Sequence, residues 1–164
     1  MSYLDRIERK ILTGSQAAEM VSKWQQDGLN VVFSNGCFDL VHRGHIEYLS
    51  KAADLGDKFV IGLNTDQSVA RIKGPKRPLV DEKSRAILLA ALTFVDAVVF
   101  FDEDTPYELI KLIKPNYLVK GADYKPESIV GYDIVTANGG AVKTIDFVEG
   151  FSSTALIQKI KEAY

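Results

Sequence analysis

The sequence predicts an α/β protein, with a doubly wound sheet of about five parallel strands and helices on both faces. Two observations support this fold class. Short apolar runs alternate along the chain with helical patterns, which is typical of buried parallel strands joined by right-handed crossovers. The chain has 164 residues, 46% of them hydrophobic. This is enough for the core of one domain, but the chain is too short for two domains of ordinary size.

The chain divides into an N-terminal part, residues 1–28, and a core, residues 29–164, within a single domain. The first 14 or so residues are expected to be a polar lead-in, after which Ser15 caps a helix that ends at Gly28. Strands are expected at residues 31–33, 59–63, 97–101, 117–120 and 141–145. Helices are expected to open at Arg43, at Thr65 or Asp66, at Asp81, at Thr105-Pro106 and at Ser153.

Composition excludes several classes of protein. A single cysteine, Cys37, excludes a disulfide framework and multi-cysteine zinc or iron–sulfur sites. The net charge of −2 argues against nucleic acid as a partner. The charged first residues do not suit a secretory signal, and no apolar run reaches the ~18 residues of a membrane span. We therefore expect a cytoplasmic protein with no membrane association.

The charge is unevenly distributed. Residues 71–85 carry a net charge of +4 against −6 for the remainder, and the only two histidines are His42 and His45. Both features follow predicted strands, and ligands of such folds bind beyond the carboxyl ends of the strands. A small anion-binding crevice is therefore expected at this edge of the sheet.

The segment 35–45 joins the first predicted core strand to its helix. Helix N-termini favour anions, and imidazoles at i and i+3 lie on the same side of the first turn. Gly44, between the histidines, is expected to let a nucleotide approach the backbone. The alternative is a polar helix start with incidental histidines. Two histidines without a third ligand make a poor zinc site, and neither a Walker A loop nor a Gly-x-Gly-x-x-Gly fingerprint is present.

A second phosphate-binding element is expected near the C-terminus, at residues 149–154. Its hydroxyls and free helix-start amides suit triphosphate oxygens. By itself, Ser152-Ser153-Thr154 before a helix would be only a cap. Together with the histidine segment it is better explained as part of a phosphate site.

These two segments resemble the Gly-x-Phe-Asp-x-x-His-x-Gly-His and Glu-Gly-x-Ser-Thr-Thr motifs of the cytidylyltransferase-like nucleotidyltransferases, a Rossmann-like family. Within that family, residues 30–160 are most similar to the adenylyltransferases of bacterial heptose biosynthesis. Further similar segments are 63–69, 73–78, 103–106 and 119–124. The chain has no kinase-sized segment and so resembles the stand-alone form. Ala122 and Ser153 depart from the usual glycine and threonine, which puts little in doubt.

The resemblance implies an enzyme that transfers AMP from ATP to D-glycero-β-D-manno-heptose 1-phosphate, with Mg²⁺ accompanying ATP and no metal ligand set of its own. The implied catalytic residues are His42, His45 and Lys73, with the histidines donating to the α- and β-phosphates. The implied nucleotide-binding residues are Asn35, Gly36, Cys37, Phe38, Gly44, Lys120, Gly121, Gly150, Ser152, Ser153 and Thr154. The implied substrate-binding residues are Asp39, Arg85, Asp123 and Tyr124.

Several roles have rival interpretations. Asp39 either orients its turn or helps to place Mg²⁺, and Arg85 has an ordinary surface salt bridge as its rival. Lys76, Arg77 and the acidic run 102–104 are better explained as solvated, whereas Cys37 is expected to be a small turn residue and Trp24 a packing residue.

Alternative functions are cytidylyl or adenylyl transfer to another phosphorylated metabolite, such as glycerol 3-phosphate or FMN, and a non-catalytic nucleotide-binding module. Related enzymes often pair, so a homodimer is also expected, although no sequence feature indicates one.

Overall fold

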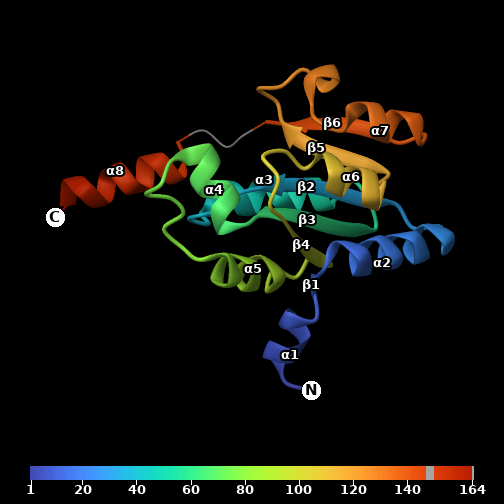
Figure 1. The fold of residues 1–164 in the computed structure, drawn as a ribbon, viewed down its shortest axis with the longest axis horizontal. Coiled ribbons are helices and arrows are strands. Elements are labelled where there is room, and N and C mark those ends of the chain that lie inside the picture. The colour runs from blue at the N-terminus through green and yellow to red at the C-terminus, as the bar shows by residue number, and fades with distance from the viewer. Residues whose placement is uncertain (147–149, 164) are drawn as a thin grey trace.

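The computed structural model describes residues 1–146 and 150–163 and contains one six-stranded sheet (Figure 1). All neighbouring strands pair in parallel, in the order β1-β4-β3-β2-β5-β6. The strands are β1 (Ile11–Leu12), β2 (Val31–Gly36), β3 (Lys58–Asn64), β4 (Ala97–Phe101), β5 (Tyr117–Gly121) and β6 (Ala141–Ile145). The predicted fold class is confirmed, with one more strand than expected.

The connections reverse direction between β2 and β5. From β2 the chain adds β3 and then β4 on one side, and crosses to the other side of β2 to add β5 and β6. In open sheets of this kind, the crevice at the carboxyl ends of the strands where the order reverses is the usual ligand site. The topology therefore predicts a ligand site at the carboxyl ends of β2 and β5.

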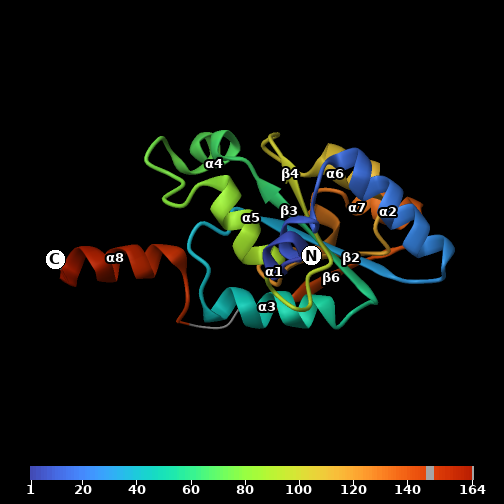
Figure 2. The ribbon, with the colours of Figure 1, turned by 90° about the horizontal axis from the view of Figure 1, so that it is seen from below.

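Helices cover both faces of the sheet (Figure 2). They are α1 (Tyr3–Glu8), α2 (Gly14–Gln26), α3 (Arg43–Ala53), α4 (Asp66–Lys73), α5 (Glu82–Ala90), α6 (Tyr107–Ile113), α7 (Tyr132–Ala137) and α8 (Ser153–Ala163), with a 3₁₀ turn at Pro126–Ser128. Among the described helices, none is long and apolar enough to cross a membrane.

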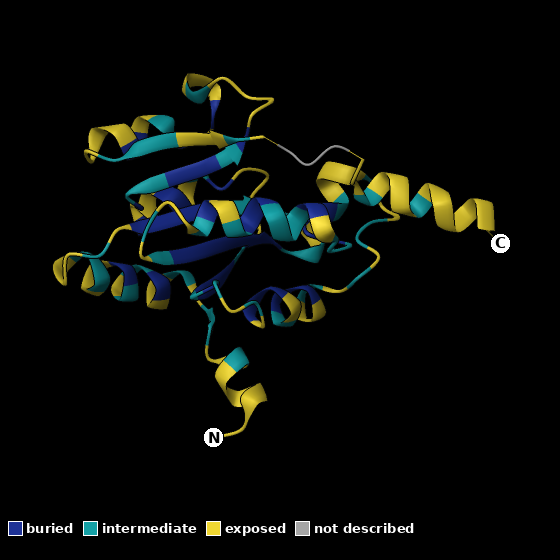
Figure 3. Cartoon of the chain, turned by 180° about the vertical axis from the view of Figure 1, so that it is seen from behind, coloured by how far each residue is buried: buried dark blue, intermediate teal, exposed yellow. Residues whose placement is uncertain are grey.

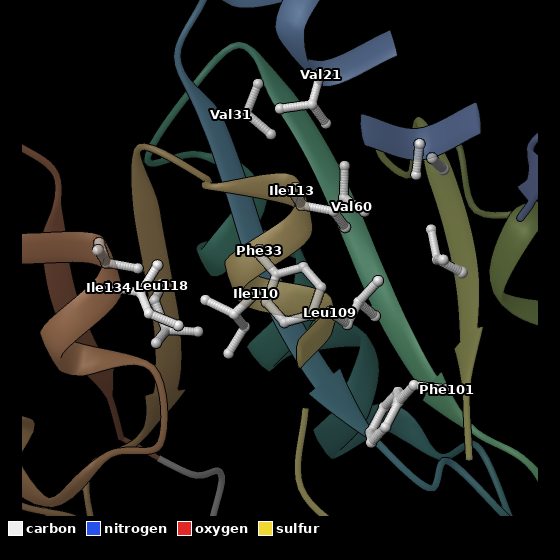
Figure 4. Close-up of a cluster of buried hydrophobic side chains, with 14 of the residues drawn as sticks. Val21, Val31, Phe33, Val60, Phe101, Leu109, Ile110, Ile113, Leu118 and Ile134 are labelled. Carbon is white, nitrogen blue, oxygen red and sulfur yellow. The ribbon is translucent and has the colours of Figure 1, made fainter. Parts of the chain in front are cut away.

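Two apolar clusters, one on each face, form the core. Figure 4 shows the first cluster, in which Phe33 and Val60 of the sheet pack with residues of α2, α6 and α7. Trp24 packs against this cluster, as expected. In the second cluster Ile61 and Leu63 pack with α3 and α5. Successive strand residues point to opposite faces, which explains why the strands are continuously apolar.

The expectation of a polar lead-in is wrong. Residues 3–8 form α1, which Ser2 caps, and β1 pairs with β4 at the sheet edge. The next helix begins at Gly14 because Thr13, rather than Ser15, accepts the hydrogen bond from the Gln16 amide.

Other boundaries also differ from the sequence expectations. Pro106 occupies the N-cap position of α6 without a side-chain hydrogen bond, so Thr105 is not the cap. The helix α5 has Asp81 as its N-cap, as expected, and ends at Ala90. Figure 3 shows that α8 is largely exposed, and none of its described residues is buried.

Candidate functional site

A cavity of about 520 Å³ lies at the carboxyl ends of the strands, within the range of ligand pockets. Twelve of the expected site residues line it: Asn35, Gly36, Cys37, Phe38, Asp39, His45, Lys73, Lys120, Gly121, Asp123, Tyr124 and Ser153. Six others do not: His42, Gly44, Arg85, Gly150, Ser152 and Thr154. Glu149, the first residue of the expected C-terminal motif, lies outside the described residues.

The two histidines lie together at the N-terminus of α3. His42 is the N-cap residue, and its Nδ1 accepts a hydrogen bond of 3.4 Å from the His45 amide. Their rings stack with centroids 3.9 Å apart and planes 21° apart, as the i, i+3 spacing predicts. The rings of Phe38 and His45 form a T-shaped pair, with centroids 5.3 Å apart. This places both imidazoles beside the free amides of a helix start.

Burial favours the neutral form of both imidazoles. Desolvation is the main cause that lowers the pKa of His45 to about 4, and the nearby His42 and Lys73 lower it further, while the Leu40 carbonyl opposes them. Desolvation also lowers the pKa of His42. Nδ1 of His45 is buried and makes no hydrogen bond among the described residues. A phosphate beside this ring would favour its protonated form.

The depressed pKa of His45 predicts that acid destabilises the ligand-free protein. Between pH 6.5, the ordinary histidine value, and about pH 4, the unfolded chain binds a proton at His45 that the folded chain excludes. The free energy of unfolding therefore falls as pH decreases through this window. We expect His45→Ala to reduce this loss, as measured by urea denaturation at pH 7.5 and 4.5. An unchanged pH dependence in the variant would contradict the proposed environment of His45.

Asp39 anchors the basic loop that follows α4. Its buried carboxylate accepts hydrogen bonds from Arg77 Nε at 2.5 Å and from the amides of Leu79 and Val80 at 2.8 and 2.9 Å. Burial alone would raise the pKa of Asp39, but the hydrogen bonds from Val80 and Arg77 bring it below its ordinary value. These bonds support the orienting role that was one of the two interpretations of Asp39, while its substrate-binding role stays a prediction. Arg77 is paired rather than solvated.

Arg85 is fully buried beneath the same loop and does not line the cavity. Its guanidinium donates to the carbonyls of Val80 at 2.9 Å, Cys37 at 2.6 Å and Asn64 at 2.9 Å, and to the Asp66 carboxylate at 2.7 Å. Four acceptors around one guanidinium leave little capacity for a ligand. The expected substrate contact, and its surface salt-bridge rival, are corrected to an internal clamp that joins the ends of β2 and β3 to the basic loop.

Two ammonium groups lie on the cavity wall. Lys73 ends α4, and Lys120 extends from β5 with its Nζ 3.5 Å from the Asn35 carbonyl. Burial leaves the Lys120 ammonium incompletely solvated, and this lowers its pKa. The side-chain Oδ1 of Asn35 is buried without a hydrogen bond among the described residues. These groups favour an anionic, hydrogen-bonding ligand.

Cys37 lies near these groups and is not activated. Desolvation raises the pKa of its thiol, and Sγ lies 3.8 Å from Asn64 Oδ1. A protonated thiol is a weak nucleophile, which agrees with its expected role as a small turn residue.

The C-terminal segment reaches the site through Phe151 and Ser153. Ser153 Oγ donates to the Leu40 carbonyl at 3.2 Å, and Ser152 Oγ, rather than Ser153, caps α8 by accepting from the Ala155 amide. A Cβ atom on Gly44 would lie 2.8 Å from Phe151 Cβ. The space that Gly44 was expected to leave for a nucleotide is therefore occupied by Phe151.

The acidic run after β4 is paired rather than merely solvated. Arg71 forms ion pairs with Asp102 at 3.5 Å and Asp104 at 3.0 Å. Within the described ranges, no group of three or more His, Cys, Asp or Glu residues could hold a metal ion.

Several cavity residues were not among the expected site residues. Asn64, Asp104 and Thr105 line the cavity. Asn64 is the last residue of β3 and the other two lie in the loop after β4, so their position at the end of a strand was the available signal. Ser128 and Val130 also line it, but no local pattern marks the short turn that carries them.

Comparisons with known proteins identify a family, similar sequences and a similar structure. Residues 33–159 match the family model described as Cytidylyltransferase-like. The chain is 51% identical over 157 residues to the "Bifunctional protein HldE" of Trichlorobacter lovleyi, covering 96% of this chain and 32% of that protein. It is 53% identical over 148 residues to the protein of the same name from Gluconobacter oxydans, covering 90% and 31%. The chain thus spans about a third of these relatives.

A solved structure is also similar. It is titled as the lipopolysaccharide core biosynthesis protein from Thermoplasma volcanium, with 31% identity and a TM-score of 0.59, and the match covers 74% of this chain and 98% of that one.

Proposed function

Because the chain belongs to the cytidylyltransferase-like nucleotidyltransferase family, we propose that it transfers AMP from ATP to D-glycero-β-D-manno-heptose 1-phosphate, releasing pyrophosphate and ADP-heptose. The bifunctional relatives support this proposal, since this chain is about half identical to the third of their length that it spans. ATP as the proposed donor also favours a cytoplasmic enzyme.

One observation carries the proposal: the stacked imidazoles of His42 and His45 share one edge of the sheet with the lysine ammoniums of Lys73 and Lys120. In the proposed reaction, an oxygen of the sugar phosphate attacks the α-phosphorus of ATP, and the bond to the β-phosphate oxygen breaks. Negative charge grows on the leaving pyrophosphate. Preorganised donors directed at such charge are the main means of catalysis in phosphoryl transfer.

Each residue of the site has its own role in the proposed reaction. His45 donates to the phosphates and gains basicity as the anion binds, while His42 lies against it. Lys73 holds a phosphate as a flexible point charge. Asp123 and Tyr124, which also line the cavity, are proposed to contact sugar hydroxyls.

The Mg²⁺ of the proposed reaction fits this wall as an ion carried by ATP. Mg²⁺ is usually held by phosphates, waters and one or two carboxylates. Asp123 is a carboxylate on the cavity wall and would hold it, whereas the oxygens of Asp39 already accept hydrogen bonds and Asp104 is paired with Arg71. When bound, the ion would neutralise charge on the phosphates.

Pyrophosphate release is the direct test. The purified protein is incubated with MgATP and the heptose 1-phosphate, and in parallel with CTP, glycerol 3-phosphate or FMN. We expect release only with ATP and the sugar phosphate. Release with CTP and glycerol 3-phosphate alone would reassign the substrates, and no release with any pair would refute nucleotidyl transfer to these acceptors.

A further inference from the structure

Phe151 forms an aromatic stack with the catalytic histidines. Its ring lies 6.2 Å from that of His42 with planes 24° apart, and the His42 ring stacks in turn on His45 at 3.9 Å. Phe151 comes from the segment before α8, more than 100 residues away in sequence from the histidines. The stack therefore joins the two phosphate-binding motifs through side chains rather than through the sheet.

Gly44 provides the place for this ring. A Cβ on Gly44 would lie 2.8 Å from Phe151 Cβ and 3.1 Å from both Cε1 and Nδ1 of His42. Any other residue there would displace one of these rings. The Arg43 guanidinium lies 5.7 Å from the Phe151 ring centroid, a cation–π distance. The first turn of α3 is thus shaped to receive Phe151.

Stacking is needed because hydrogen bonds hold His42 only weakly. The His42 side chain accepts from the His45 amide at 3.4 Å, which is long for an N–H donor. The anchors of α8 are weak as well: none of its described residues is buried, and Ser153 Oγ bonds to Leu40 at 3.2 Å. Phe151 stacks on His42 and directly precedes the first turn of α8, so one side chain can stabilise both.

We propose that Phe151 is a positioning residue: by packing over Gly44 and stacking on His42, it holds the His42 imidazole and the first turn of α8 in the arrangement that binds the phosphates. The expected effect on kcat rests on the proposed nucleotidyl transfer. The expected effect on the position of the His42 ring does not, and it can be measured in the protein without substrate.

Phe151→Ala tests the proposal, with Phe151→Tyr as the conservative variant. Phe151 is 42% exposed, so alanine opens no sealed cavity. We expect kcat with ATP and the sugar phosphate to fall about ten- to a hundredfold, because small misplacements of catalytic groups have effects of this size. The KM of the sugar phosphate should change by less than about twofold, which is much less than the expected fall in kcat. Phe151→Tyr keeps the ring and should restore most of the rate.

Proton NMR gives an independent readout, since the chain has only two histidines and so two sets of imidazole signals. Burial lowers the pKa of His42, and removing the Phe151 ring should raise it towards the ordinary value. Gly44→Ala should produce the same shift. The double variant should be no worse than either single one, because both changes disrupt one contact.

Ile160→Ala is the matched control, as an exposed apolar residue of α8 far along the helix from the stack. A loss in Ile160→Ala equal to that in Phe151→Ala would show a general effect of α8 and overturn the proposal. Unchanged kcat and an unchanged His42 titration in Phe151→Ala would also overturn it. If the wild-type protein transfers no nucleotide, the proposed function fails, while the His42 titration still decides the role of Phe151.

Discussion

His45→Ala is expected to lower kcat by about 10²–10³-fold, the usual effect of removing one preorganised donor to developing charge. The ring lines the cavity and is buried enough to lower its pKa to about 4, so that the imidazole is neutral before an anion binds. These properties suit a group whose partner arrives with the substrate. Since the His45 side chain is only partly buried, the fold should lose little stability at pH 7.

Steady-state kinetics and a thermal melt, both at pH 7.5, check this prediction together. Glu47→Ala is the control on the same helix: Glu47 pairs with the exposed Arg43 at 2.5 Å and does not line the cavity. We expect Glu47→Ala to keep its rate. A His45→Ala protein that melts normally and turns over at near the wild-type rate would remove His45 from the mechanism.

The sheet was predictable wherever its strands are locally apolar. Ala97–Phe101 and Ala141–Ile145 have the same bounds in sequence and structure. β1 could not be predicted because it has two residues, and it exists only through its pairing with Val98 and Val99 of β4. The hydrogen bonds to β4, and not the apolar pattern of residues 11–12, make this segment a strand.

The site was predictable where function resides in short motifs, as with the stacked histidines. It was not predictable where a charged side chain finds partners far along the chain. Asp39 and Arg77 are 38 residues apart and bonded through a carboxylate that looked available to a ligand. Residue type and spacing indicate that a charge lies near the crevice. They do not reveal whether the fold has already neutralised it.

Arg85→Met is expected to lower the free energy of unfolding by about 3–5 kcal/mol, the usual cost of breaking a buried charged network by removing one partner. The guanidinium is fully buried and donates to three carbonyls and to Asp66. Methionine fills similar space but leaves the carbonyls of Cys37 and Asn64 without these hydrogen bonds. Both carbonyls lie beside the cavity, so turnover should fall as well.

Urea denaturation of the wild-type protein and three variants distinguishes the clamp from a simple loss of charge. Lys83→Met, on the exposed side of the same helix, should change stability by less than about 0.5 kcal/mol. Arg85→Lys keeps the charge but replaces a planar fork that reaches four acceptors with a single ammonium, so it should fold yet remain clearly less stable than wild type. If Arg85→Lys matched the wild type, charge alone would explain the site. If Arg85→Met lost no more than Lys83→Met, the guanidinium would not stabilise the loops at all.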